Sequence, residues 1–166
     1  MKKVLLSDLE DFLRHGLKRK LARDLHQLKI IKEADIECCA FYHIRRFIRG
    51  DVRWRVFARK HSPQTGYYTD LVVFKRFKAQ LAVEIKWNRR VISKKDRRAL
   101  AKMRSSLRVK KSYFICVIPD GRYVKVSKHQ SERYCFFEIV VTLGFKGKTA
   151  QEKVKRWKQE RTKFRI

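Results

Sequence analysis

Acidic residues are scarce in this chain. Its 166 residues include 44 Lys and Arg but only 16 Asp and Glu, so the formal net charge is +28. A charge excess of this size opposes a compact state by self-repulsion and favours a polyanionic partner. Nucleic acid fits best, because neutralising its phosphates releases counterions and gives affinity that does not depend on base sequence. An anionic membrane is the rival partner, but the positive charge is spread along the chain and is not confined to one amphipathic segment.

Long apolar runs and paired cysteines are also missing. No run approaches the ~18 apolar residues of a membrane span, and Ser7 and Asp8 interrupt the short apolar stretch that follows the basic start. We therefore expect neither a signal peptide nor a membrane partner. None of the four cysteines lies in a CxxC pair, which disfavours zinc and favours buried, reduced thiols in a cytoplasmic protein. They are Cys38, Cys39, Cys116 and Cys135.

What is present fits one domain by length, with a 44% apolar fraction that suffices for a core. Residues 4–32 have leucines at helical spacing between Lys and Arg, which predicts a basic amphipathic helix. Ser7-x-x-Glu10 has the pattern of a capping box at its start, and Gly16 is a candidate break point. Two interpretations stay open for this helix: it packs on the domain, or it contacts DNA as an arm.

A second helix is predicted at residues 33–49. Glu37 falls on its expected apolar stripe, with Glu33 one turn above. A carboxylate on an apolar face costs several kcal/mol unless it is paired or coordinated. Glu37 is therefore either an ion-pair partner of one of the many arginines or a further acid in a functional site. The expected stripe consists of Ala34, Glu37, Phe41, Ile44 and Ile48.

The stretch Tyr67–Asn88 predicts two strands joined by a tight reversal, after an earlier strand at 53–60. Side chains alternate along a strand, so Glu84 and Lys86 share one face of the second strand. If the hairpin pairs symmetrically about Phe77, residue 70 lies opposite residue 84. Strands are ~4.8 Å apart, so the carboxylates of Asp70 and Glu84 would be close enough to share a divalent cation. The alternative is that both acids are ion-pair partners of Lys86 or an arginine, although two opposed acids repel each other without a cation.

Further elements follow this hairpin. Ser93-x-x-Asp96 predicts a capped helix, the apolar run 112–119 predicts a strand covered on both faces, and strands at 122–126 and 134–143 precede a basic helix at 149–163. The basic residues around the start of the capped helix are candidate nucleic-acid contacts. They are Arg89, Arg90, Lys94, Lys95, Arg97 and Arg98.

This order of elements resembles the PD-(D/E)XK nuclease superfamily, which includes restriction endonucleases and Holliday-junction resolvases. Thr69-Asp70-Leu71 and Val83-Glu84-Ile85-Lys86 carry the resemblance, with Glu37 upstream and the helix from Ser93 downstream. Thr69 replaces the family's proline, a departure that the superfamily often shows. The resemblance covers about residues 33–120 of a single domain 1–166. The basic helix 4–32 and the segment 121–166 lie outside it.

The resemblance implies an α/β fold with a restriction-endonuclease-like αβββαβ core, a mixed central sheet flanked by helices, and extra basic helices at both ends. It implies catalytic roles for Asp70, Glu84, Lys86 and Glu37. Mg²⁺, for which Mn²⁺ can substitute, would be held by Asp70, Glu84 and the backbone carbonyl of Ile85, with Glu37 as an optional further ligand.

The function so implied is a metal-dependent DNA endonuclease, with junctions, flaps and single strands among its candidate substrates. The alternative is a catalytically silent, basic nucleic-acid-binding protein on the same fold, and a third is a structural protein of a ribosome or virion. Retention of Asp70, Glu84 and Lys86 together favours the enzyme. RNA as a substrate and a homodimeric state stay open.

Overall fold

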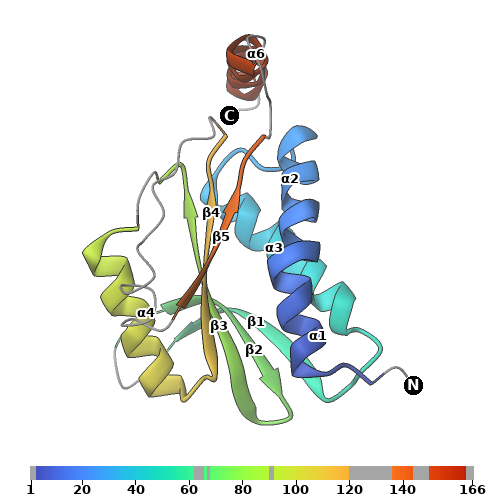
Figure 1. Ribbon diagram of the computed structural model, residues 1–166, viewed down its shortest axis with the longest axis vertical. Coiled ribbons are helices and arrows are strands. Elements are labelled where there is room, and N and C mark those ends of the chain that lie inside the picture. The colour runs from blue at the N-terminus through green and yellow to red at the C-terminus, as the bar shows by residue number, and fades with distance from the viewer. Residues whose placement is uncertain are drawn as a thin grey trace.

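The computed structural model describes residues 3–61, 66, 68–89, 92–119, 136–143 and 150–163. Over these residues the protein is an α/β fold, with a five-stranded mixed sheet between helices (Figure 1). The helices are α1 (Leu6–Asp11), the π-helical η1 (Phe12–Leu17), α2 (Lys18–His26), α3 (Glu33–Ile48), α4 (Lys94–Leu107) and α6 (Ala150–Thr162). The strands are β1 (Trp54–His61), β2 (Tyr68–Lys75), β3 (Lys78–Trp87), β4 (Lys111–Val117) and β5 (Phe136–Val141).

The sheet has the order β1-β2-β3-β4-β5. Strands β1, β2 and β3 form an antiparallel meander, whereas β3, β4 and β5 run parallel. The connection from β3 to β4 contains α4, as a parallel crossover requires. From Ser112 onward β4 is buried on both faces, which confirms the prediction for the apolar run 112–119. The strand expected at 122–126 lies outside the described residues.

The basic helix at the N-terminus belongs to the core. Elements α1, η1 and α2 continue one another from Leu6 to His26 and cover one face of the sheet together with α3 (Figure 1). Their leucines are fully buried in the larger apolar cluster, beside side chains of β2, β3 and β4. Of the two interpretations of residues 4–32, the structure shows the one in which the helix packs on the domain. The leucines concerned are Leu9, Leu13, Leu17, Leu21 and Leu25.

The opposite face of the sheet is covered by α4. A smaller apolar cluster forms there, in which Leu100 and Met103 of α4 meet Phe114 and Phe136 of the sheet. Helix α6 lies beyond the end of the sheet (Figure 1) and is attached by Trp157, whose indole Nε1 donates a 2.9 Å hydrogen bond to the carbonyl of Leu25.

The start of the first helix differs from the prediction. The helix begins at Leu6, and the Asp8 carboxylate accepts a 2.9 Å hydrogen bond from the N–H of Leu5. The Ser7-x-x-Glu10 capping box is therefore wrong. The carboxylate of Glu10 instead pairs with Lys111 of β4 at 2.6 Å, a contact between residues 101 positions apart.

Gly16 does not break the helix, contrary to expectation. It lies within the π-helical η1, where a Cβ added to Gly16 would stand 2.5 Å from Cδ2 of Phe12. Phe12 is itself held by a stacked contact with Phe47, with ring centroids 4.2 Å apart. The glycine is thus required by the close approach of this ring.

Helix α3 has only part of the predicted buried stripe: Ile44 and Ile48 are buried as predicted, but Ile36 is buried where Ala34 was expected. Burying Ile36 removes more apolar surface from water than burying Ala34, and it keeps the Glu37 carboxylate off the apolar face. The same phase leaves Cys38 exposed, so the expectation of buried thiols holds for Cys116 but is wrong for Cys38. The buried residues of the helix are Ile36, Ala40, His43, Ile44 and Ile48.

No helix in the described part of the chain has the length and the apolar composition that a membrane span requires.

Candidate active site where β2 and β3 separate

The pairing of β2 with β3 has the predicted register near the acids. Leu71 pairs with Val83 and Val73 with Leu81, which is the register symmetric about Phe77. A bulge after Val73 then shifts the register by one residue. The hairpin therefore closes with a two-residue turn, and the predicted symmetry does not extend to the tip. At its other end the pairing stops at Leu71 and Val83 within the described strands, whereas β3 continues along β4 as far as Trp87.

The separation of β2 from β3 leaves backbone N–H groups of β3 without a strand partner, and two carboxylates accept hydrogen bonds from them. Asp70 accepts a 2.6 Å hydrogen bond from the N–H of Ile85. Glu33, at the first residue of α3, accepts a 3.0 Å bond from the N–H of Trp87. Buried amides need such partners. The side chains of residues 70 and 84 were expected to face each other across the two strands. Instead, the Asp70 carboxylate turns toward the backbone of β3 and binds the N–H of Ile85.

Glu84 and Lys86 lie on one face of β3, as predicted. Lys86 Nζ donates a 2.6 Å hydrogen bond to Glu84 Oε1 and lies 3.6 Å from Glu33 Oε1. Both side chains are largely buried, with 11% of Glu84 and 16% of Lys86 exposed. Their neighbours on β4 are Phe114 and Cys116, which belong to the apolar cluster under α4. A lysine and an acid are thus held in an apolar setting at the edge of this cluster.

The electrostatics of this site favour a cation. Burial raises the pKa of Glu84 from 4.5 to about 7, and the charge of Asp70 adds to this, against the opposing effect of Lys86. Burial likewise raises the pKa of Asp70 from 3.8 to about 6, where the Ile85 N–H and Lys86 oppose the rise and Glu37 and Glu33 add to it. One lysine therefore does not offset the cost of ionising both carboxylates.

Lys86 itself is firmly protonated. Burial lowers the pKa of its ammonium group, but the charge and hydrogen bond of Glu84, together with the charges of Asp70 and Glu33, outweigh this and raise the pKa overall. At neutral pH Lys86 is a hydrogen-bond donor and a positive charge.

Glu37 is paired with an arginine. Its Oε2 lies 3.1 Å from Nε of Arg59 on β1, and 13% of the Glu37 side chain is exposed. Of the two interpretations left open for Glu37, the structure shows the ion pair. Glu37 nevertheless lies close enough to Asp70 for its charge to raise the pKa of that carboxyl group.

Glu33 belongs to the site although sequence reasoning did not place it there. The signal that was available is its position in the first turn of a helix, where acids are favoured. The contact with Trp87 spans 54 positions in the chain. It depends on where the N-terminus of α3 meets β3, which no local pattern encodes.

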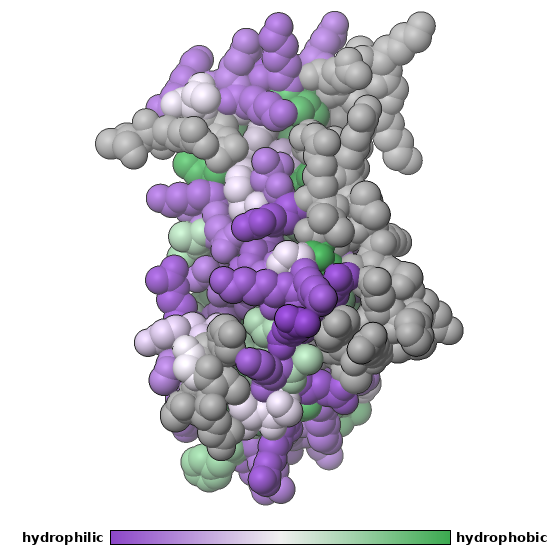
Figure 2. Space-filling model, turned by 90° about the vertical axis from the view of Figure 1, so that its left-hand side faces the viewer, coloured by the Kyte–Doolittle hydropathy of each residue, from purple (hydrophilic) through white to green (hydrophobic). Residues whose placement is uncertain are grey.

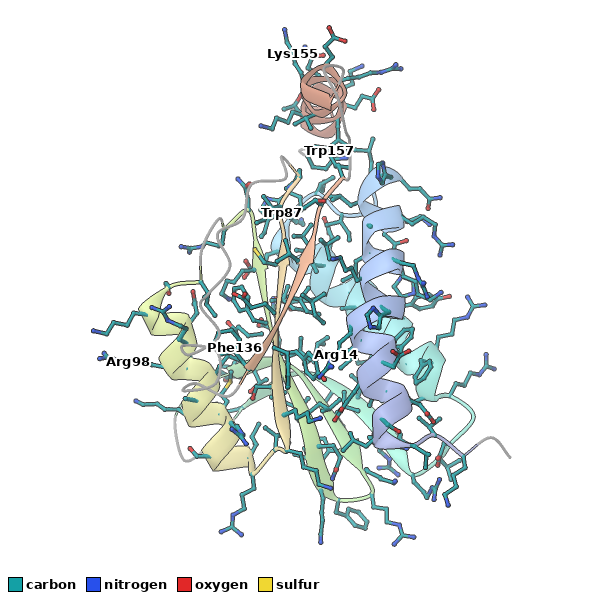
Figure 3. The ribbon with its side chains drawn as sticks, in the orientation of Figure 1. Arg14, Trp87, Arg98, Phe136, Lys155 and Trp157 are labelled. Carbon is teal, nitrogen blue, oxygen red and sulfur yellow. The ribbon has the colours of Figure 1, made fainter. Side chains whose placement is uncertain are left out.

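A basic surface flanks the site on the α4 side. The predicted capping box is confirmed, since Ser93 Oγ accepts a 3.1 Å hydrogen bond from the Asp96 N–H and the Asp96 carboxylate accepts one from the Ser93 N–H. Figure 3 shows Arg98 of α4 pointing away from the sheet, and Figure 2 shows that this side of the molecule is mainly hydrophilic. Of the candidate nucleic-acid contacts, Arg89, Lys94, Lys95 and Arg98 are exposed, Arg97 is half-buried and Arg90 lies outside the described residues.

The donor atoms at the site fit a hard cation such as Mg²⁺. Mg²⁺ keeps several waters and takes one or two carboxylates, which Asp70 and Glu84 provide. The N–H and the C=O of one residue in a strand point to the same side. The carbonyl of Ile85 therefore faces the gap between β2 and β3, as its N–H does. Within the described part of the chain no group of three or more His, Cys, Asp and Glu side chains is arranged as a metal site. The fit therefore rests on two carboxylates.

Comparisons with family models, with curated proteins and with solved structures give no match for this chain.

Proposed function

We propose that this protein is a metal-dependent DNA endonuclease of the PD-(D/E)XK type, with Asp70, Glu84 and Lys86 at its centre. One observation carries the proposal: Glu84, which is buried, and Asp70 and Lys86, which are half-buried, lie where two strands separate, in an acid-rich cluster on a chain with a net charge of +28. A chain with few acids gains nothing for its solubility by burying several of them together. A site that binds a cation and a phosphate requires such a cluster.

The topology supports the same proposal. Helix α3, the antiparallel strands β1 to β3, helix α4 and strand β4 parallel to β3 follow one another in the order of the αβββαβ core that the sequence motifs imply. In this arrangement the acids of β2 and β3 lie at the point where the antiparallel pairing stops.

The chemistry divides among these residues by charge. When bound, Mg²⁺ would neutralise charge on the phosphate and lower the pKa of a water molecule. It would be held by Asp70, Glu84 and the carbonyl of Ile85. Lys86, which is protonated in this structure, would donate hydrogen bonds to the phosphate or to the attacking water. Glu33 is a positioning residue, because it holds the end of β3 through the Trp87 N–H.

One observation favours the alternative of a catalytically silent nucleic-acid-binding protein. Asp70 accepts from a backbone amide and Glu84 pairs with Lys86, so each side chain has a role in the fold without a metal. The experiment must therefore separate charge from structure.

Cleavage of duplex, single-stranded, flap and four-way-junction DNA is the test, with Mg²⁺, with Mn²⁺ and with EDTA. Asp70→Asn is the decisive variant, because its amide oxygen still accepts from Ile85 but carries no charge. Glu10→Gln is the control, since it likewise replaces a largely buried carboxylate, which accepts a 2.6 Å hydrogen bond from Lys111, by its amide outside the site. We expect metal-dependent cutting that is lost in Asp70→Asn with DNA binding retained, and unchanged in Glu10→Gln. Tight binding without cutting in either metal would refute the enzyme and establish the alternative.

A further inference from the structure

The tip of the β2–β3 hairpin carries an aromatic side chain that the fold does not use. Phe77 is 95% exposed, more than any other large apolar side chain that the structure describes, and Val52 follows at 75%. Its neighbour Arg76 has a φ of 56°. In two-residue hairpin turns with a positive φ at the first central position, glycine is the preferred residue there. Arg76 is thus not the residue that folding alone favours at this position.

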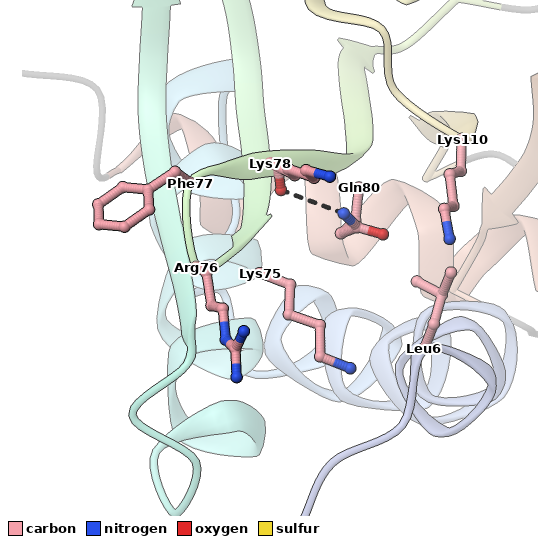
Figure 4. A pocket seen from close by; sticks show the side chains of 7 residues that line it. All are labelled: Leu6, Lys75, Arg76, Phe77, Lys78, Gln80 and Lys110. Carbon is pink, nitrogen blue, oxygen red and sulfur yellow. Dashed lines mark hydrogen bonds between the residues drawn. The ribbon is translucent and has the colours of Figure 1, made fainter.

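A cationic pocket of about 420 Å³ lies beside this tip. Figure 4 shows the ammonium groups of Lys75 and Lys110 directed into the space between the hairpin and Leu6 of α1, while the ring of Phe77 points away on the other side of the tip. The lining contains four cations and no acid, and none of the four forms an ion pair with another described residue. The lining residues are Leu6, Lys75, Arg76, Phe77, Lys78, Gln80 and Lys110.

Aromatic rings exposed next to cations that have no acidic partner are what proteins use to bind unpaired nucleic acid, because every base has a face that can stack and every nucleotide has a phosphate. We propose that this hairpin tip binds unpaired nucleotides, with a base stacked on Phe77 and phosphates on the lysines of the pocket. A membrane surface is the less suitable partner, because a single aromatic ring offers little apolar area for insertion.

This site is separate from the acid cluster. Six strand steps of ~3.3 Å separate Lys78, which follows Phe77, from Glu84, so the tip lies about 20 Å from Glu84 along β3. That distance corresponds to about six base pairs of duplex, at ~3.4 Å per step. The inference goes beyond the proposed nuclease and does not require cleavage. Together the two sites would fit DNA in which a single-stranded segment adjoins a duplex, as in a flap or a junction.

Equilibrium binding in EDTA tests the proposal, by fluorescence anisotropy of a labelled single strand, a flap and a blunt duplex of equal length. Stacking of a base on an aromatic ring contributes ~1–3 kcal/mol, so Phe77→Ala should bind the single strand and the flap about 5- to 150-fold more weakly. The blunt duplex should lose little affinity. Phe77→Trp should retain binding, and Val52→Ala, which removes an exposed apolar side chain elsewhere, should bind as the wild type does. Because Phe77 is exposed, its truncation should leave the thermal midpoint unchanged.

The pocket is tested by salt dependence. The double variant Lys75→Gln/Lys78→Gln should reduce the slope of log K against log salt by about 1.4 on the single strand, since each phosphate contact contributes ~0.7. Equal affinity of Phe77→Ala and wild type for the single strand would overturn the proposal, and so would equal losses on single strand and duplex. Phe77-dependent binding to anionic vesicles without Phe77-dependent binding to DNA would overturn it in favour of a membrane. The binding assay contains EDTA, so its result does not depend on cleavage. If the protein cuts no DNA in the cleavage test but Phe77→Ala loses single-strand binding, the result supports this site and refutes only the nuclease.

Discussion

Replacing Glu84 by glutamine should change how the stability of the protein depends on pH. Below pH 4.5 the carboxyl group is protonated in both the folded and the unfolded chain and contributes no pH dependence. Between pH 4.5 and about 7 the unfolded chain loses the proton that the buried group keeps. The unfolded state then binds fewer protons, so the free energy of unfolding falls as the pH rises.

The magnitude follows from the two pKa values. The difference between 4.5 and about 7 corresponds to roughly 3 kcal/mol of unfolding free energy, all of it lost by pH 8. Glu84→Gln has no such titration, so its stability relative to wild type should increase by roughly 3 kcal/mol from pH 4.5 to pH 8. Lys86 can still donate to the amide oxygen of glutamine, and weakening of this bond shifts the whole curve but not its slope, because Lys86 stays charged throughout this range.

Urea unfolding followed by tryptophan fluorescence, in EDTA at constant ionic strength, measures this difference. Glu10→Gln, analysed in parallel, gives the cost of breaking an equivalent pair with a lysine. A difference between Glu84→Gln and wild type that stays constant from pH 4.5 to pH 8, or that decreases, would refute the argument that burial suppresses ionisation of Glu84.

Addition of Mg²⁺ extends this prediction. A ligand that binds only the folded state stabilises it by ~2.7 kcal/mol at one hundred times its Kd. Mg²⁺ needs ionised carboxylates, so it should stabilise the wild type at pH 8 and have little effect at pH 5, where Asp70 and Glu84 retain their protons. An equal effect at both pH values, or one that persists in Glu84→Gln, would show that the ion binds elsewhere.

Three further predictions concern positions outside the acid cluster. Gly16→Ala should lower the free energy of unfolding by about 1–3 kcal/mol in spite of the better helix propensity of alanine, because its Cβ meets the Phe12 ring at 2.5 Å; urea unfolding that shows stabilisation would contradict this. Trp157→Phe should lower the free energy of unfolding by about 1 kcal/mol, because it removes the donor to the Leu25 carbonyl. Hydrogen exchange of the α6 amides should then become faster, and unchanged exchange would mean that this bond does not attach α6. Arg76→Gly should raise the unfolding free energy by up to about 1 kcal/mol by relieving a positive φ while weakening DNA binding, and a loss of stability would show that the turn is unstrained.

Local patterns in the sequence were sufficient for much of the fold. The capping box at Ser93 and Asp96 was predictable because both partners lie within one helical turn. The common face of Glu84 and Lys86 was predictable because alternation along a strand is a property of the backbone. The register near Leu71 and Val83 also followed from spacing, although the turn at the tip did not, because a bulge intervenes before it.

Features that depend on contacts far apart in the chain were not predictable. The prediction for α3 was wrong in its first turn, where Ile36 and not Ala34 is buried, although the larger apolar surface of Ile36 was a signal in the helix itself. Glu10 has the spacing of a capping residue but pairs with Lys111 on β4. The tertiary structure brings this lysine next to Glu10, and the spacing within the helix does not show it. Glu33 was missed for the same reason, because its partner is a backbone amide of a distant strand.

The two carboxylates that meet β3 connect these observations. An antiparallel pair that stops early exposes the N–H groups of Ile85 and Trp87, which Asp70 and Glu33 satisfy. For Asp70 this places negative charge in a largely buried position, whereas 41% of the Glu33 side chain is exposed. A neutral acceptor such as asparagine or glutamine would satisfy the same amides without that cost. Structure alone therefore does not require an acid at Asp70, whereas cation binding does. The charge of the carboxylate, and not its hydrogen bond, is therefore what would distinguish a catalytic centre from a strand end that is only capped. Asp70→Asn removes the charge and keeps the hydrogen bond, so it tests which of the two is present.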